Sequence, residues 1–572
     1  RQEVNCDNRR SFTPVLGGRE PDRDCARALP EGSNGIGYET GQDFYGSEYA
    51  EYGGSQRGGE FGGRDRLDRR DRPKYSVTLS YGTILSEVVP IFFGTIRVSQ
   101  VRWQPVAVLA YIDGMKPGSV FFFCGVGGSG MSAIAQVLAG RGFRVLGSDR
   151  NHDRGLHSEL FSNLVAQGIT LVPQDGSAVS EEVSELIVSS AVEPSIPDVA
   201  SAQKLGIPIR KRAELLADLF NGGRGIAVGG TSGKSTVTGM IGRILHAAGQ
   251  DPTVVSGGRM RDFDDPPSLG NAINGTGAIV IEADESDGTI AYYRPHISVL
   301  TNISFDHKPI EELIPLFRDF CKSAVDVAVV NADCPVSMDA THGIERVTFG
   351  MDNPADFVAD AIFATPQGMA FSLNDRPMTI PLPGRHNVAN ALAAVAACQR
   401  EGVSLGLAAN TVATFKGIAR RLEVLGTSDG VTVIDDFAHN PDKISAAVAA
   451  LKASGGRLHV MFQPHGFGPT KMLRTGLVEA LVEGLDADDH VWMPEIFYAG
   501  GTADRSISSA DLVEDIDDAG IPATFLADRK ALGERIVEDA RQGDRVVVMG
   551  ARDDSLTEFG FALLMQLSRR RS

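Results

Sequence analysis

Paired cysteines, long apolar runs and an excess of positive charge are all missing from this sequence. The six cysteines among 572 residues form no CxxC pair, so neither a disulfide framework nor a structural zinc site is indicated, and a reducing compartment is expected. No run of 18 apolar residues occurs, and no segment has the pattern of a secretory signal. The sequence therefore predicts a cytoplasmic protein without a membrane-spanning helix.

Acidic residues outnumber basic residues by 73 to 55, which gives a formal net charge of −18. This balance argues against a protein that binds nucleic acid or an anionic membrane non-specifically, although one local basic cleft can still hold phosphates. With 42% hydrophobic and 22% charged residues, the composition is typical of a soluble globular enzyme. The length is sufficient for several domains with buried cores.

Residues 1–74 differ in composition from the rest of the chain. They contain 13 glycines, 13 basic and 14 acidic residues, which leaves too little apolar surface to offset the entropy of ordering, so we predict a mostly disordered segment. An RNA-binding tail rich in Arg and Gly is the alternative, which the small excess of acidic residues disfavours. Residues 75–114 contain strand-like runs that we assign to no domain. Because the first methionine is Met115, residues 1–114 are interpreted as an extension, a fusion or an artefact of how the reading frame was drawn.

From Met115 onward, apolar β-branched runs alternate with helical periods. We expect strands near residues 120–125, 144–149, 185–191, 225–230, 278–284, 297–304 and 326–333. We expect helices near residues 129–142, 234–249 and 388–402. This alternation predicts an α/β protein with doubly wound parallel sheets. The pattern falls into blocks of about 115–222, 223–418 and 419–572.

The first block begins with a strand, a glycine-rich turn and a helix. The turn contains Gly125, Gly127, Gly128 and Gly130, which would let the backbone approach a pyrophosphate at the start of the helix. Asp149 ends the next strand, where a carboxylate can bind a ribose hydroxyl. From these residues we infer a site for NAD(P) or another dinucleotide. A tight turn without a ligand is the alternative.

The second block contains a stronger phosphate signal. The strand GIAVG leads into Gly230-Thr-Ser-Gly233-Lys234-Ser235 and then into a helix. The spacing departs from the strict GxxxxGK[ST] pattern, because Val228 stands where its first glycine belongs. Even so, backbone N–H groups and Lys234 in this context can hold phosphate oxygens, and Ser235 can ligate Mg²⁺.

Carboxylates gather about fifty residues further on. Glu282, Asp284, Glu285 and Asp287 follow a predicted strand, and such a cluster is favoured where cations are near. A solvated charge run is the alternative, but the neighbouring phosphate loop favours a hard cation. His307 follows the next predicted strand and is a candidate Mg²⁺ ligand or phosphate contact, with a purely structural histidine as the alternative.

Taken together, these motifs resemble the Mur ligase family, the ATP-dependent amide-bond ligases of peptidoglycan precursor synthesis, and most resemble its alanine-adding branch. The resemblance covers about residue 120 to the C-terminus. The motifs that carry it, in chain order, are GVGGSGMS, SSA, IPIRKRAELLADL, GTSGKST, EADESD, TNISFDH, GRHNVANALAA, ARRLEV, DDFAHNP and FQPH.

The resemblance implies a three-domain architecture with residues 1–114 outside it. Residues 115–222 would form a Rossmann-like UDP-sugar-binding domain, residues 223–418 a central P-loop ATP-binding domain, and residues 419–572 a C-terminal α/β ligase domain. The implied cofactors are ATP and Mg²⁺, and the implied partners are a UDP-sugar and an amino acid. The first glycine-rich turn is thereby reassigned from NAD to a uridine diphosphate.

The resemblance also implies residue roles, carried over by position. It implies catalytic roles for Lys234, Glu282, His307 and Arg421, and Mg²⁺ ligation by Ser235, Glu282 and His307. The implied ATP contacts are Gly230, Thr231, Gly233, Lys234, Ser235, Thr236, His386, Asn387, Asn390, Arg421 and Asp436. The implied UDP-sugar contacts are Gly125, Gly127, Gly128, Gly130, Met131, Ser132, Asp149, Ser189 and Ser190. The implied amino-acid pocket consists of His439, His465 and Lys471.

Several positions depart from the family pattern. Ser232 and Ser304 stand where the alanine-adding branch usually carries His and Glu. Arg318 aligns with a lysine that is carbamylated in some Mur ligases, so a carbamylated side chain is not expected at this position. After FQPH the branch continues with an arginine-rich segment, whereas this chain reads Gly466-Phe-Gly-Pro-Thr-Lys471. Two alternatives therefore remain open. The first is a related ligase that uses another amino acid or a non-murein carboxylate. The second is a nucleotide-binding regulator without ligase activity.

Overall fold

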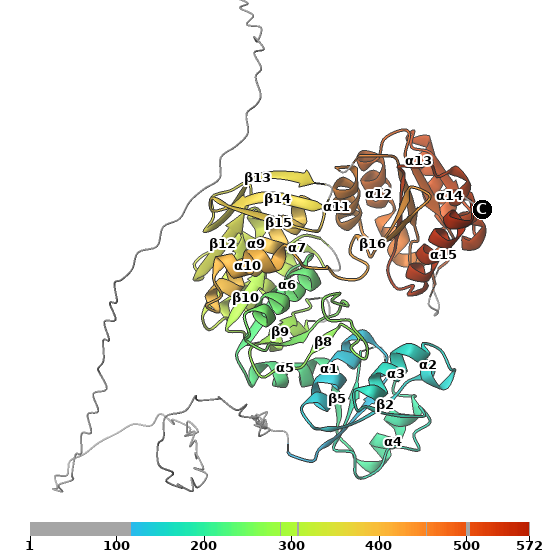
Figure 1. Ribbon diagram of the computed structural model, residues 1–572. Coiled ribbons are helices and arrows are strands. Elements are labelled where there is room, and N and C mark those ends of the chain that lie inside the picture. The colour runs from blue at the N-terminus through green and yellow to red at the C-terminus, as the bar shows by residue number, and fades with distance from the viewer. Residues whose placement is uncertain are drawn as a thin grey trace, which may run out of the picture. The chain divides into compact units, whose positions relative to one another are not determined.

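Figure 1 shows the structure, a computed structural model, which describes residues 116–570 except 191, 286–287, 306–307, 366, 454 and 499–503. The predictions for residues 1–114 and for His307 fall outside the described residues. Within the described residues, no helix has the length and apolar character that crossing a membrane requires. The named strands form three sheets, built in turn from residues 120–211, 225–380 and 423–549.

The first sheet is parallel throughout, with strand order β3-β2-β1-β4-β5. Its strands are β1 (Val120–Cys124), β2 (Arg144–Ser148), β3 (Thr170–Val172), β4 (Glu185–Val188) and β5 (Ile209–Lys211). Its helices are α1 (Ser129–Gly140), α2 (Arg150–Asp153), α3 (Ser158–Ala166), α4 (Pro197–Leu205) and α5 (Arg212–Asn221). Phe121 and Phe123 belong to one hydrophobic core and Phe122 to another, because a parallel sheet buries both of its faces.

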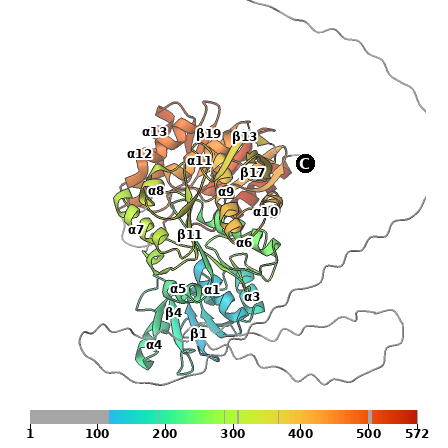
Figure 2. The same ribbon diagram turned by 90° about the vertical axis from the view of Figure 1, so that its left-hand side faces the viewer.

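The second sheet has ten strands in the order β15-β14-β13-β12-β11-β10-β6-β9-β7-β8. Its strands are β6 (Gly225–Gly229), β7 (Thr253–Val255), β8 (Ala272–Ile273), β9 (Ile279–Glu282), β10 (Ile297–Leu300), β11 (Val327–Asn331), β12 (Arg346–Gly350), β13 (Phe357–Thr365), β14 (Gly368–Leu373) and β15 (Arg376–Ile380). Its helices are α6 (Lys234–Ala247), α7 (Ile310–Lys322), α8 (Pro335–Ala340), α9 (Arg385–Arg400) and α10 (Leu405–Val412). Figure 2 shows α7 and α8 on one side of β11 and α6, α9 and α10 on the other.

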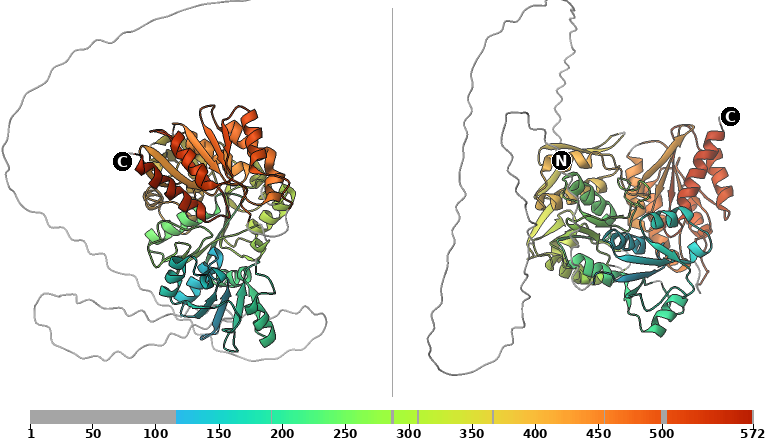
Figure 3. Two further views of the ribbon diagram at one scale, coloured as in Figure 1. Left: turned by 90° about the vertical axis from the view of Figure 1, so that its right-hand side faces the viewer. Right: turned by 60° about the horizontal axis from the view of Figure 1, so that its bottom comes forward.

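The third sheet has the order β16-β17-β21-β18-β19-β20. Its strands are β16 (Glu423–Ser428), β17 (Val431–Asp436), β18 (Leu458–Phe462), β19 (His490–Met493), β20 (Ala523–Phe525) and β21 (Arg545–Met549). Its helices are α11 (Pro441–Lys452), α12 (Phe467–Gly484), α13 (Ser509–Asp518), α14 (Arg529–Asp539) and α15 (Ser555–Arg569). Figure 3 shows the orange strands of this sheet with helices on both faces.

Antiparallel strands at the sheet edges add to the expected parallel, doubly wound pattern. β8 runs antiparallel to β7, β13 to β15 form an antiparallel meander, and β16 runs antiparallel to β17. The connection between β14 and β15 consists of Asn374 and Asp375, both with positive φ. Two such residues favour a tight hairpin, so the sequence contained a signal for this turn.

The inner strands and helices confirm the expected α/β pattern. The expected strands appear as β1, β2, β4, β6, β9, β10 and β11, and the expected helices as α1, α6 and α9. β6 lies between β10 and β9, and all three are parallel. Their carboxyl ends therefore meet at one edge of the second sheet, which is where doubly wound sheets bind ligands.

Candidate active site

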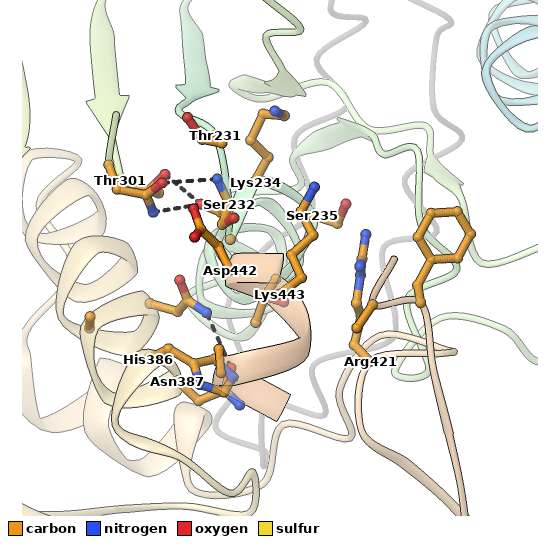
Figure 4. Close-up of a pocket in the computed structure, with 18 of the residues that line it drawn as sticks. Thr231, Ser232, Lys234, Ser235, Thr301, His386, Asn387, Arg421, Asp442 and Lys443 are labelled. Carbon is orange, nitrogen blue, oxygen red and sulfur yellow. Dashed lines mark hydrogen bonds between the residues drawn. The ribbon is translucent and has the colours of Figure 1, made fainter. Parts of the chain in front are cut away.

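A cavity of about 720 Å³ lies at this edge of the second sheet. Its walls come from the ends of β6, β9 and β10, the starts of α6 and α9, and residues 421–447 and 552 of the C-terminal block. Among the residues with implied roles, it is lined by Thr231, Gly233, Lys234, Ser235, Thr236, Glu282, His386, Asn387, Asn390, Arg421, Asp436 and His439. Figure 4 shows Lys234, Ser235, Asn387 and Arg421 around it.

The phosphate loop requires both of its glycines. Gly230 has φ 127° and Gly233 has φ 88°, a region that side chains disfavour. A Cβ on Gly230 would lie 2.1 Å from Thr301 Oγ1, and a Cβ on Gly233 would lie 2.4 Å from Asn390 Oδ1. The loop is therefore packed directly against the end of β10 and the start of α9.

Residues 301–304 hold this loop in place. Asn302 Oδ1 accepts from Ser232 N at 3.0 Å, and Thr301 Oγ1 donates to Ser232 O at 2.6 Å. Thr231 Oγ1 donates to Ser304 O at 3.1 Å. Thr301, Asn302 and Ser304 also line the cavity, and they are site residues that our implied roles omitted although the TNISFDH motif contains them.

Lys234 is the first residue of α6, and its ammonium lies at the phosphate loop. Lys234 Nζ donates to Gly230 O at 2.7 Å and to Glu285 Oε2 at 2.8 Å. The Glu285 side chain is only 4% exposed, so this is a largely desolvated ion pair. The carboxylate run after β9 thus reaches the lysine of the phosphate loop.

Ser235 and Glu282 offer oxygen ligands beside this lysine. Ser235 Oγ donates to Glu282 Oε2 at 2.9 Å, while Glu282 Oε1 accepts from Ser256 Oγ at 2.7 Å and from Gly257 N at 2.6 Å. The anchored carboxylate and the hydroxyl form the oxygen-only donor set that Mg²⁺ prefers. Ser235 and Glu282 therefore fit the implied Mg²⁺ site, whereas His307, the third implied ligand, lies outside the described residues.

The start of α9 supplies polar groups to the wall beside the phosphate loop. Asn390 Nδ2 donates to Asn387 Oδ1 at 3.2 Å, and Asn387 Nδ2 donates to Pro383 O at 2.7 Å. His386 lines the cavity with an exposed side chain, and desolvation by nearby protein atoms lowers its pKa below the ordinary 6.5. Its ring is therefore neutral near pH 7 and can stack or accept a hydrogen bond without charge.

Arg421 enters the cavity from a strained turn. Arg420 and Leu422 on either side of it have φ 58° and 49°, which is costly for side chains of this size. Asp436 Oδ2 accepts from Leu422 N at 2.7 Å, and its Oδ1 accepts from Ala438 N at the same distance. The Arg421 guanidinium lies 4.9 Å from the centre of the Phe437 ring. Asp436, implied as a ribose contact, thus holds the turn that presents Arg421.

The glycine-rich turn of the first block lies outside this cavity. Gly125 has φ 81°, and Asp149 accepts from Gly127 N at 3.0 Å and from Asn151 N at 2.8 Å. A Cβ on Gly127 would lie 2.9 Å from Asp149 Oδ2. Gly128 caps α1. The carboxylate expected at a ribose therefore also braces the turn itself.

The remaining implied UDP-sugar contacts are arranged around the same turn. Gly130 is the second residue of α1 and lies close to Arg212, and the Met131 side chain is buried in the core. Ser132 Oγ donates to Ser129 O and accepts from Asn271 Nδ2 at 2.9 Å. Ser189 and Ser190 follow β4 at the carboxyl edge of the sheet.

The implied amino-acid pocket is only partly assembled at the cavity. His439 lines it, its Nδ1 lies 2.8 Å from Phe437 O, and its ring lies 5.4 Å from that of His465. Because a carbonyl oxygen only accepts, Nδ1 of His439 carries the proton and Nε2 is the basic nitrogen. Lys471 is not among the lining residues, and its Nζ lies 2.9 Å from Ser506 Oγ and 3.3 Å from Asp504 Oδ2.

Three charged cavity residues of the C-terminal block were missed by the sequence analysis. They are Asp442, Lys443 and Arg552. Asp442 and Lys443 follow the DDFAHNP motif directly, so their place beside that motif was the available signal. Arg318, in contrast, donates to Ala340 O at 2.9 Å and is not among the lining residues.

Comparisons with known proteins cover all three blocks. The chain matches the Mur ligase family catalytic domain over residues 121–224, the Mur ligase middle domain over 228–398 and the Mur ligase glutamate ligase domain over 420–552. It is 33% identical to a UDP-N-acetylmuramate–L-alanine ligase of Thermosynechococcus vestitus, over 75% of this chain and 92% of that one. It is 34% identical to the enzyme of the same name from Gloeobacter violaceus, over 77% and 95%.

Solved structures agree with these matches at the level of the fold. The crystal structure of a UDP-N-acetylmuramate-alanine ligase from Thermotoga maritima aligns with TM-score 0.66 at 24% identity, over 79% of this chain and 99% of that one. A murein peptide ligase from Psychrobacter arcticus aligns with TM-score 0.57 at 24% identity over the same shares. With relatives above 30% identity that are covered almost end to end, this chain belongs to the Mur ligase family.

Proposed function

We propose that this protein is an ATP-dependent ligase that joins an amino acid to the carboxylate of UDP-N-acetylmuramate or a similar UDP-sugar, in peptidoglycan precursor synthesis. The observation that carries the proposal is the convergence of Lys234, Glu282 and Arg421 on one cavity. They come from a helix start, a strand end and the C-terminal block. The names of the relatives supply the substrate class.

In the first step of the proposed reaction, a carboxylate oxygen of the UDP-sugar attacks the γ-phosphorus of ATP. The bond between this phosphorus and the bridging oxygen breaks, and ADP leaves with the electron pair. Such a transfer needs in-line placement and neutralisation of the charge on the phosphoryl oxygens. Lys234 and Arg421 supply fixed positive charge on the cavity wall.

The second step forms the amide. The amine nitrogen of the amino acid attacks the carbon of the acyl phosphate, the carbon–oxygen bond to phosphate breaks, and inorganic phosphate leaves as the nitrogen releases a proton. The acyl phosphate must be kept from water until the amine arrives. Residues of both the middle and the C-terminal blocks line the proposed site.

Mg²⁺ and the UDP-sugar are assigned by the chemistry of the available side chains. Ser235 and Glu282 would hold Mg²⁺, which supplies charge neutralisation on the phosphates when bound. The glycine-rich turn after β1 would hold the uridine diphosphate, because it lies at the start of α1 at the carboxyl edge of a parallel sheet.

The test is amine-dependent release of phosphate. The purified protein is incubated with ATP, Mg²⁺, UDP-N-acetylmuramate and L-alanine, and the product is weighed by mass spectrometry. We expect phosphate release that needs both co-substrates, and a product heavier than the UDP-sugar by one amino acid less water. Phosphate release that is indifferent to the amine, or ATP binding without any product across a panel of amino acids, would favour the regulator instead.

A further inference from the structure

Lys443 occupies a position at which a helix normally carries an acid. It is the third residue of α11, and its backbone N–H donates to the Oδ1 of the capping residue Asn440 at 3.0 Å. The positive end of the helix dipole disfavours a cation there, and a capping box has Glu or Gln at this position.

Two other helices of this chain carry an acid at this third position. The third residue of α5 is Glu214, and the third residue of α13 is Asp511, and each accepts a hydrogen bond from the backbone of its capping residue. A lysine at the same place in α11 works against the helix. Its presence there points to a role for the side chain elsewhere.

That side chain faces the proposed ATP site. Lys443 is half-buried and lines the same cavity as Lys234, Ser235 and Glu282. Figure 4 shows it extending from the start of α11 toward Ser235. Lys234 is held by Gly230 O and Glu285, and Arg421 lies over the Phe437 ring. Lys443 adds a further basic side chain to the lining of this cavity, from the C-terminal block.

We propose that Lys443 is a catalytic residue that contacts the γ-phosphoryl group of ATP while it passes to the carboxylate of the UDP-sugar. This inference rests on the proposed ligase function. During the transfer, negative charge spreads over the three outer oxygens of the phosphoryl group. The phosphate loop and Ser235 face this group from the middle block, and the ammonium of Lys443 meets it from the C-terminal block.

The test separates a chemical role from a structural one by measuring both in the same variants. In K443Q the glutamine suits the helix start, so we expect an unchanged or higher thermal midpoint together with a fall in kcat of about 10²-fold. K443R should keep more of the activity than K443Q. The control is K530Q, which replaces an exposed lysine in the first turn of α14, away from the cavity.

A binding measurement gives a second readout. ADP alone and ADP with aluminium fluoride, which mimics the phosphoryl group in transfer, are titrated into each variant with Mg²⁺ present. We expect the affinity of K443Q for ADP alone to lie within about twofold of that of wild type. Aluminium fluoride increases the affinity for ADP, and we expect this increase to be at least tenfold smaller in K443Q than in wild type. An unchanged gain from aluminium fluoride, or a loss of activity that parallels a loss of thermal stability, would overturn the proposal.

The same measurements on K234Q separate this inference from the proposed function. If wild type itself shows no amine-dependent turnover, the ligase proposal fails. If K234Q binds ATP and turns over like wild type, only the phosphate-loop assignment fails. If K234Q is impaired while K443Q matches wild type in kcat and in the aluminium fluoride gain, only the role of Lys443 is overturned.

Discussion

Lys234 Nζ lies 2.8 Å from Glu285 Oε2, so the lysine of the phosphate loop is bound to a carboxylate that is almost fully buried. The pair joins the start of α6 to the segment after β9, 51 residues further along the chain. Removing one partner of such a pair leaves an uncompensated buried charge. Lys234 therefore supports the loop as well as serving the chemistry proposed for it, and variants must distinguish the two.

Lys234→Gln should remain folded and lose ligase activity by about 10² to 10³-fold, because its amide can still donate to Glu285 but carries no charge for a phosphate. Steady-state phosphate release measures the loss, and urea unfolding measures stability. Lys234→Ala should be less stable than Lys234→Gln, and the added change Glu285→Gln should restore stability without restoring activity. Lys204→Ala, at an exposed site in α4, is the control. Turnover near the wild-type rate in Lys234→Gln would show that the loop does not serve phosphate chemistry.

Glu282→Gln should raise the Mg²⁺ concentration for half-maximal activity by at least about tenfold, because an amide oxygen is a poorer ligand for a hard cation than a carboxylate. The hydrogen bonds from Ser256 and Gly257 to the remaining oxygen should keep the fold. A Mg²⁺ titration of activity gives the result, with Glu479→Gln on an exposed turn of α12 as the control. An unshifted Mg²⁺ requirement would remove Glu282 from the metal site.

The enzyme should prefer L-alanine over glycine and L-serine less strongly than an enzyme whose arginines bind the amino-acid carboxylate. The basic side chains after FQPH are already engaged, Lys471 with Asp504 and Ser506, and Arg474 with Asp515 at 2.7 Å. Neither is among the residues lining the cavity, so neither offers the two-pronged grip on a carboxylate that arginine can provide there. We expect kcat/KM for L-alanine to exceed that for glycine and L-serine by less than 100-fold. A preference of 100-fold or more, about 2.7 kcal/mol, would show that the changed segment carries no specificity.

His490 should make the protein less stable in mild acid. Burial lowers its pKa to about 4 from the ordinary 6.5, although nearby Asp539 opposes the shift. Between these two values the unfolded chain binds a proton that the folded chain does not, so stability is complete above pH 6.5 and falls as the pH drops toward 4. The loss attributable to this group is up to about 3 kcal/mol.

The check is urea unfolding at pH 7 and pH 5 for wild type and His490→Phe. Phenylalanine keeps the stacking on Trp492, whose ring centre lies 3.9 Å away, but loses the hydrogen bond to Thr524. We expect the variant to be less stable at pH 7 and to lose less stability than wild type on going to pH 5. Equal losses in the two proteins would mean that His490 titrates normally.

Much of the architecture could be predicted from local patterns. The strand GIAVG, the turn GTSGKS and the following helix could be predicted because each depends on a pattern of only a few neighbouring residues. These patterns are the apolar run of a buried strand, the glycines of a turn with positive φ, and the helical periodicity. The antiparallel meander β13 to β15 was missed even though Asn374 and Asp375 mark its hairpin. That omission was a failure to use a local turn signal.

The composition of the cavity could not be obtained in this way. Lys234 and Lys443 are 209 positions apart in the sequence, and they line the same cavity only because the C-terminal block supplies residues to the cavity of the second sheet. The same holds for Asp436, which holds the Leu422 backbone, and for Lys471, which pairs with Asp504. The sequence by itself determined the elements and their phosphate-binding turns, since those depend on short-range sterics and periodicity. Which side chains meet depends on strand order and on long-range packing, and only the folded chain contains that information.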